Sequence, residues 1–197
     1  MHRLVRGTQR ETGSVEQDLA PARKVSVKRL ESRALGPFSS SWAALVAALI
    51  RENSRMLGQK HHRLVVTTNA QGFTNITAEV QRWLAAIGTR DGLLTLFVQH
   101  TSASLVIQEN TDPDVLRDLT DALDHLAPQD RTYRHDLEGP DDMPAHIKAM
   151  LTSTSLSIPV LGGRATLGQW QAIYLAEHRT HPHQRQIVLH YLGEFSP

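Results

Sequence analysis

The sequence predicts an antiparallel α+β domain that follows an N-terminal extension. Short apolar runs with strand character recur after about residue 62, and segments between them carry apolar residues at helical spacing. Several strands around one or two helices favour a single antiparallel α+β domain. Apolar residues make up 40% of the 197-residue chain, which is enough for one sizeable core.

Residues 1–58 are expected to be an extension that is disordered or partly helical, and residues 59–197 to form the domain. The first part of the extension shows no sustained periodicity. Residues 41–57 can form a helix that begins at a serine. Met56 stands just before the first strand-like run, so we hypothesise that the functional chain begins near it and that the preceding residues are dispensable or not native.

The first half of the domain is expected to contain three strands and a helix. The strand candidates are RLVVTT (63–68), GLLTLFVQ (92–99) and SLVIQEN (104–110). The sequence NITAEVQRWLAAIG (75–88) predicts a helix with Thr77 as its N-cap and Gly88 as its stop. Because the polar HTSA separates two of the strands, His100 is expected near a strand end.

A second helix is predicted at 111–127, TDPDVLRDLTDALDHLA, with Thr111 or Asp112 as its cap and Pro113 in its first turn. Its apolar residues recur at helical spacing, and we expect them to form a buried stripe. The stripe consists of Val115, Leu116, Leu119, Leu123 and Leu126.

The remainder of the chain predicts one helix and three strands. PAHIKAML (144–151) has a proline where a helix would start. The strand candidates are SLSIPV (155–160), LGQWQAIYLAEH (167–178) and RQIVLHYLGE (185–194), with turns at 162–163 and 180–184. Trp170 is expected in the core, and Tyr174 either in the core or in a pocket wall.

Composition excludes several classes of function. The net charge of +1 provides no global basic field, so nucleic acid is not an expected partner. The absence of cysteine excludes disulfides, zinc–thiolate sites and a cysteine nucleophile, and leaves His, Asp and Glu as metal ligands. No run approaches the roughly 18 apolar residues of a membrane span. We therefore expect a soluble, cytoplasmic protein.

One short stretch, HDLEGPDDMPAHIK (135–148), gathers two histidines and four carboxylates around a turn and a helix start. A turn between His135 and His146 can bring the two imidazoles together. The helix start at Pro144 can attract an anion, with Lys148 nearby. A simpler alternative is that the two aspartates before Pro144 cap the helix and that both histidines bond locally.

Two more histidines, His100 and His178, lie at expected strand ends. Neutral imidazoles with an open coordination position are typical of a catalytic divalent metal, and Glu109 or Asp112 can supply an oxygen ligand or orient one. The ligand types suit zinc, manganese, iron or nickel. Four other histidines are expected to be solvated loop or terminal residues: His61, His62, His181 and His183.

Other catalytic patterns are missing. Two serines follow His100 closely, but the chain has no GxSxG elbow. LGGRATLG lacks the order of strand, glycine loop, lysine and helix that defines a P-loop, and it indicates a hairpin turn.

Four segments closely resemble the YjbQ family, whose members are also described as secondary thiamine-phosphate synthases. The segments are FVQHTSASLVIQENTDPDV, YRHDLEGPDDMPAHIKAML, SIPVLGGRATLGQWQAIYLAEHR and RQIVLHYLGE. The resemblance covers about residues 62–194. It implies a compact α+β fold with an antiparallel, β-sandwich-like core and flanking helices, usually assembled as a homotrimer, around a histidine-lined site for a metal or an anion.

The resemblance also implies roles for individual residues. Its motif histidines fall on His100, His135, His146 and His178, which are the expected metal ligands, and its acidic positions fall on Glu109, Glu138, Asp141 and Asp142. The expected catalytic residues are His100, Glu109, Glu138 and His146. The expected substrate or anion contacts are Thr101, Ser102, Ser104, Asn110, Lys148 and Arg179.

The implied reaction joins a hydroxymethylpyrimidine pyrophosphate to a thiazole phosphate and releases pyrophosphate, with a divalent cation such as zinc, magnesium or manganese as cofactor. Two alternatives use the same residues. One is metal-assisted hydrolysis of a small phosphorylated or carbonyl substrate, with Glu138 as base. The other is a non-catalytic trimer that captures a phosphorylated metabolite or a metal.

Overall fold

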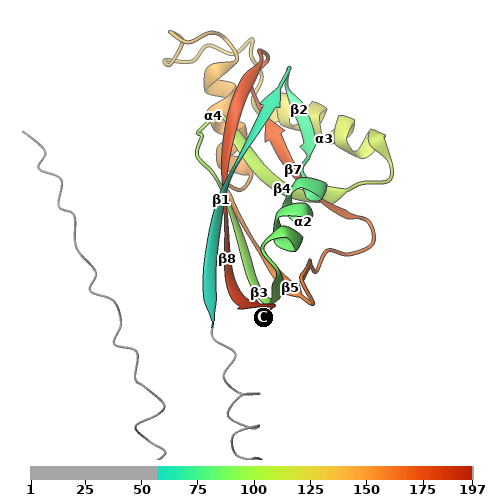
Figure 1. Cartoon of the computed structure of the whole chain (residues 1–197). Coiled ribbons are helices and arrows are strands. Elements are labelled where there is room, and N and C mark those ends of the chain that lie inside the picture. Colours follow the sequence, from blue (N-terminus) through green and yellow to red (C-terminus); the bar gives the residue numbers. More distant parts are fainter. Residues whose placement is uncertain (1–56, 197) are drawn as a thin grey trace, which may run out of the picture. The chain divides into compact units, whose positions relative to one another are not determined.

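The computed structural model describes residues 57–196 (Figure 1), which form an α+β fold. The elements are β1 (Gly58–Thr68), β2 (Gly72–Asn75), α2 (Thr77–Ala86), β3 (Thr89–Val98), β4 (Ala103–Glu109), α3 (Pro113–Leu126), α4 (Asp142–Leu151), β5 (Ser155–Leu161), β6 (Arg164–Ala165), β7 (Gln171–Glu177) and β8 (His183–Phe195). The hypothesis about Met56 and nearly all of the expected extension lie outside the described residues. Within the described part of the chain, no helix is both long and apolar enough to cross a membrane.

Two antiparallel sheets face each other across the core. The five-stranded sheet has the order β1-β8-β3-β5-β6, and the three-stranded sheet has the order β2-β7-β4. Buried side chains from both sheets, such as Leu96 and Leu175, belong to one cluster, which Val80 and Leu84 of α2 extend. Figure 1 shows α2 beside the two sheets. The β-sandwich-like core expected from the resemblance is confirmed.

Buried and exposed side chains alternate along β3, and this pattern shows which face of the large sheet packs on the core. Leu94 and Leu96 are buried, whereas Leu93 and Phe97 point to the opposite face and are exposed. Leu94 lies opposite Ile158 of β5 and Tyr191 of β8, which are also buried. Since side chains alternate between the two faces of a strand, one face of this sheet packs on the core and the other remains open in the described chain.

Helices α3 and α4 lie against the outer face of the three-stranded sheet, where both contact β4. Asp112 caps α3 by accepting the N–H of Asp114 at 2.9 Å. The expectation of a fully buried stripe on α3 is wrong, because none of its residues is buried and Leu126 is 63% exposed. The helix packs on a sheet of only three strands, so its apolar side is covered only in part.

Two local expectations also need correction. Thr77 does not cap α2: its N–H is accepted by the Asn75 side chain at 3.0 Å, and its hydroxyl accepts the N–H of Ile173 at 2.9 Å. Trp170 is 56% exposed rather than in the core, because it precedes β7 in a loop. Gly88, by contrast, ends the helical segment as expected, with a φ of 66° that favours glycine.

Candidate metal-binding site

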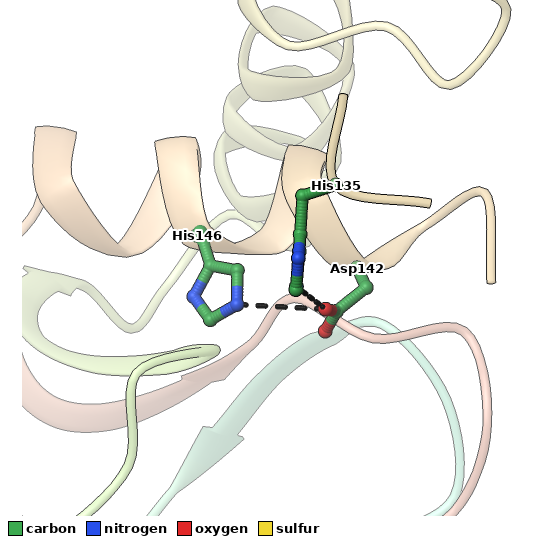
Figure 2. A group of neighbouring side chains, drawn as sticks. All are labelled: His135, Asp142 and His146. Atoms are coloured by element: carbon green, nitrogen blue, oxygen red, sulfur yellow. Dashed lines mark hydrogen bonds and ion pairs between the residues drawn. The ribbon is translucent and has the colours of Figure 1, made fainter. Parts of the chain in front are cut away.

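Three side chains from 135–148 converge at the start of α4 (Figure 2): His135, Asp142 and His146. We call them the His–Asp–His group. Their ligating atoms lie within 4.8 Å of one another. His135 Nε2 is 2.7 Å from Asp142 Oδ2, and His146 Nε2 is 3.5 Å from the same oxygen. The turn therefore brings the two imidazoles together, with ring centres 5.5 Å apart.

The fold sets the direction of each imidazole. Asp142 and His146 are four residues apart on α4, so they share one face of the helix. His146 Nδ1 lies 3.0 Å from the carbonyl oxygen of Thr101. A carbonyl only accepts hydrogen bonds, so Nδ1 carries a proton, and Nε2 is the nitrogen that faces Asp142 and that a metal would contact. Metal-binding histidines usually donate their second ring N–H to a carbonyl or carboxylate in this way.

Arg179 holds the aspartates at the helix start. Its Nη1 donates to Asp142 Oδ1, its Nε to Asp141 Oδ2 at 3.1 Å, and its Nη2 to the carbonyl of Glu138 at 2.8 Å. Asp141 occupies the N-cap position, but its side chain makes no capping bond. It accepts instead from the N–H and the hydroxyl of Thr180 at 2.8 and 3.0 Å. The expected aspartate caps are thus replaced by a bond network to the end of β7.

Burial alone would raise the pKa of Asp141, but hydrogen bonds from Thr180 and Arg179 outweigh it and lower the pKa to about 2. Asp141 is therefore a carboxylate throughout the ordinary pH range. Its charge keeps Arg179 bound to the helix start, and this contact holds Oδ2 of Asp142 toward the two histidines.

Exposure within the group is uneven. The Asp142 side chain is 3% exposed, whereas those of His135 and His146 are 45% and 32% exposed. The carboxylate thus lies buried at the bottom of the group, and both imidazoles are accessible from solvent. Two imidazole nitrogens and one carboxylate oxygen make a donor set that suits a divalent transition metal with open coordination positions.

His100 lies beside this group but does not belong to it. It follows β3, and its Nε2 accepts the N–H of Gln186 at 2.8 Å, so that this nitrogen is occupied. Burial and the nearby charge of Arg185 lower the pKa of His100, which keeps the ring neutral. His100 and Thr101 line an open depression of about 530 Å³. The remaining lining residues are Phe97, Val98, Gln99, Ser102 and Thr154.

His178 is separated from the His–Asp–His group. It is 2% exposed, on the face of the three-stranded sheet that the helices cover, and its Nε2 lies 2.9 Å from the hydroxyl of Ser104. Burial, followed by the charge of Lys148, lowers the pKa of His178 to about 4. The expected metal ligand is thus a neutral interior histidine, and the expected substrate contact Ser104 is its buried partner.

Neither cation expected to bind an anion is available. Lys148 is fully buried and forms an ion pair with Asp124, whose carboxylate also accepts from Gln71 at 2.8 Å. Arg179 is committed to the two aspartates and a carbonyl. Both side chains therefore stabilise the packing of α4 rather than face a ligand.

The remaining expected residues are dispersed. Glu109 and Asn110 lie at the C-terminal end of β4, whereas Ala103 begins that strand. At the usual rise per residue, the two ends of β4 are about 20 Å apart. Glu138 is exposed in the loop before α4, and its carboxylate forms no hydrogen bond or ion pair within residues 57–196. Thr101 contributes its backbone carbonyl to His146, and Ser102 lines the depression.

Of the four histidines expected to be solvated loop or terminal residues, three lie on strands, and His181 lies in a turn, where it is exposed as expected. His61 and His62 are on strand β1, where His62 stacks on Trp83 with ring centres 6.0 Å apart. His181 lies in the turn before β8 and His183 begins that strand. None of them belongs to the His–Asp–His group. The resemblance placed an acidic motif position on Asp142, but the expected metal ligands did not include it. The predicted helix began at Pro144, so the four-residue spacing of Asp142 and His146 on one helix face emerged only from the structure, in which α4 begins at Asp142.

The sandwich with two covering helices, together with a His–Asp–His group at the start of α4, defines a class of small α+β proteins with a candidate metal site. A family model described as "UPF0047 protein YjbQ-like" matches residues 62–194. The chain belongs to this family, as the sequence resemblance indicated.

Individual relatives support the assignment. A UPF0047 protein of Synechocystis sp. is 50% identical over 137 residues, covering 69% of this chain and 93% of the relative. The UPF0047 protein YjbQ of Escherichia coli O157:H7 is 43% identical over 132 residues, with coverages of 66% and 96%.

Solved structures show the same fold. A YbjQ-like protein of unknown function from Sulfolobus solfataricus matches with a TM-score of 0.66 and 25% identity, covering 71% of this chain and 100% of that one. A conserved hypothetical protein from Thermus thermophilus matches with a TM-score of 0.58 and 41% identity, covering 65% and 97%.

The pKa of His178 predicts a pH-dependent stability. Its folded value of about 4 lies below the ordinary value of 6.5, so the unfolded chain binds the proton first as the pH falls. Stability from this group is complete above pH 6.5 and is lost toward pH 4, by roughly 2 kcal/mol at pH 5. We expect His178→Gln to reduce the difference in unfolding free energy between pH 7.5 and pH 5 by about that amount, measured by urea denaturation.

The exposed His181→Gln variant is the matched control and should keep the wild-type difference. An unchanged pH dependence in His178→Gln would show that this histidine is not held neutral by burial.

Proposed function

We propose that the protein is a metal-dependent enzyme that acts on a small phosphorylated metabolite, and that the His–Asp–His group binds a divalent metal. The observation that carries the proposal is the approach of three ligating atoms within 4.8 Å on the accessible side of a buried carboxylate. As the reaction we propose the transfer of a hydroxymethylpyrimidine group to a thiazole phosphate, with release of pyrophosphate.

The residues present fit a metal by their chemistry. The hydrogen bond from His146 Nδ1 to Thr101 leaves Nε2 as the nitrogen available to a metal, and the second oxygen of Asp142 is fixed by Arg179. The 2.7 Å contact between His135 and Asp142 places a proton between two ligand atoms, and a cation would replace that proton. Such a cation would supply positive charge that neutralises the oxygens of a pyrophosphate leaving group.

The rest of the chemistry requires positioning more than proton transfer. In the proposed reaction, the thiazole nitrogen forms a bond to the methylene carbon of the pyrimidine, and the carbon–oxygen bond to pyrophosphate breaks with its electron pair. The nitrogen loses no proton, so no strong base is needed. The neutral His100 and the hydroxyl of Ser102 in the adjoining depression are suited to orient the organic rings by hydrogen bonds.

We also propose that the chain assembles as a homotrimer, and that its large sheet forms the contact. The open face of that sheet exposes several apolar side chains, as contact surfaces commonly do. They are Val65, Leu93, Phe97, Leu161 and Leu192, which are 43–61% exposed. Phe97 also lines the 530 Å³ depression, so a neighbouring copy that packs on this face would form one side of the depression.

Metal binding is the first test. Elemental analysis after loading with Co²⁺ or Zn²⁺ should give about one ion per wild-type chain. Removing one ligand, in His135→Ala or His146→Ala, should weaken affinity by at least about 100-fold, because even an outer-shell partner is worth 10–100-fold. The control His181→Ala removes an exposed histidine outside the group and should bind as wild type does. Equal metal content in all four proteins would contradict the site.

Turnover is the second test. Metal-loaded protein should release pyrophosphate from hydroxymethylpyrimidine pyrophosphate only when the thiazole phosphate is also present, and His146→Ala should abolish release. Release without the thiazole would instead show a hydrolase, which uses the same group with water as the acceptor. Stoichiometric metal with no release under either condition would leave a metabolite-binding protein.

Association through the large sheet predicts a mass of three chains by light scattering. Leu93 lies on the central strand, opposite Pro159 and Leu192, so Leu93→Glu places a charge in the middle of the exposed face. We expect this variant to dissociate to monomers. The control Leu126→Glu changes an exposed leucine on α3 and should keep the trimer. A monomeric wild-type protein would refute the assembly.

A further inference from the structure

We propose that Arg131 forms an anion subsite that binds the phosphate group of the metabolite beside the metal. This inference rests on the proposed function and adds a residue that neither the sequence motifs nor the expected site contained. It starts from a second depression, of about 190 Å³, next to the His–Asp–His group.

His135 joins the two features. It lines the second depression together with Arg131, Tyr133 and Asp136, and its Nε2 contacts Asp142 at 2.7 Å. A molecule in this depression would therefore lie against His135, one member of the His–Asp–His group. A volume of 190 Å³ holds several water molecules, each of which occupies about 30 Å³ in the liquid, so a phosphate group fits.

Arg131 is the arginine at this site whose hydrogen-bonding groups remain free. Its only contact among the described residues is with the ring of Tyr133, whose centre lies 5.8 Å from the guanidinium carbon. The Tyr133 hydroxyl donates to the carbonyl of Pro128 at 3.0 Å, which anchors the ring. Arg179 and Arg185, by contrast, are buried in ion pairs with carboxylates. Arg131 can thus offer its planar set of donors to an incoming anion, and this geometry matches phosphate.

Charge balance makes the subsite depend on the metal. Asp136 lines the same depression and offsets the positive charge of Arg131. The two side chains together therefore provide no net attraction for an anion. A divalent cation on the neighbouring group makes the site positive, so phosphate should bind the metal-loaded protein more tightly than the metal-free protein.

The experiment is an isothermal titration of inorganic phosphate into full-length protein loaded with Co²⁺, whose visible absorption reports that the metal stays bound. We expect Arg131→Gln to weaken phosphate binding about tenfold or more and Asp136→Asn to tighten it. Arg134→Gln makes the same charge change at an exposed neighbour that does not line the depression, and should bind phosphate as wild type does. Co²⁺ affinity should stay within about twofold in all three variants.

Phosphate binding that is the same in Arg131→Gln and wild type, with Co²⁺ in place, would overturn the subsite and leave the metal site standing. If the wild type binds no Co²⁺, the metal proposal fails by itself, and the titration is repeated on metal-free Asp136→Asn, in which the charge of Arg131 is no longer offset. Phosphate binding to that variant that a further Arg131→Gln substitution weakens would retain the anion site. Binding that the substitution leaves unchanged, or no binding, would overturn it.

Discussion

The contact between Arg179 and the two aspartates at the start of α4 is the interaction on which the site depends. It joins the end of β7 to the first turn of the helix, and it occupies one oxygen of Asp142 so that the other faces the histidines. All three charged groups are at least nine-tenths buried. Burying charge costs free energy unless every group is paired, and without the arginine the two carboxylates would keep only their contacts with Thr180 and His135. The same bonds that hold the helix in place therefore orient the proposed ligand.

The arginines and lysines discussed above, all within the described part of the chain, are of two kinds: buried ones paired with carboxylates, and exposed ones. Lys148, Arg179 and Arg185 are buried and bound to carboxylates. These pairs connect the helices, the loop before α4 and the strand ends, and they hold the three cations in the interior. In the proposed function, positive charge for a phosphorylated molecule comes from a bound metal and from an exposed side chain. Arg131 would be that side chain, and it lines the same depression as His135, a member of the proposed metal site.

The 530 Å³ depression beside the His–Asp–His group adds an apolar surface to the site. It is open, and Phe97 gives it an apolar edge that continues onto the exposed face of the large sheet. Thr101 lines the depression, and its carbonyl accepts a hydrogen bond from His146, so the orientation of the imidazole depends on the loop between β3 and β4. The proposed ligand site and the proposed assembly face are therefore neighbouring surfaces of one small domain.

Apolar periodicity was enough to predict the α+β class and most of the strands and helices, and the short turn allowed, without requiring, the approach of His135 and His146. Tertiary structure decided the rest. Only packing shows that His178 is enclosed with Ser104, and that Glu109 lies at the far end of β4. Only packing shows that Lys148 and Arg179 are neutralised by partners distant in sequence. Spacing along a chain reports which residues share a helix or a turn, whereas burial and charge pairing arise when separate elements meet.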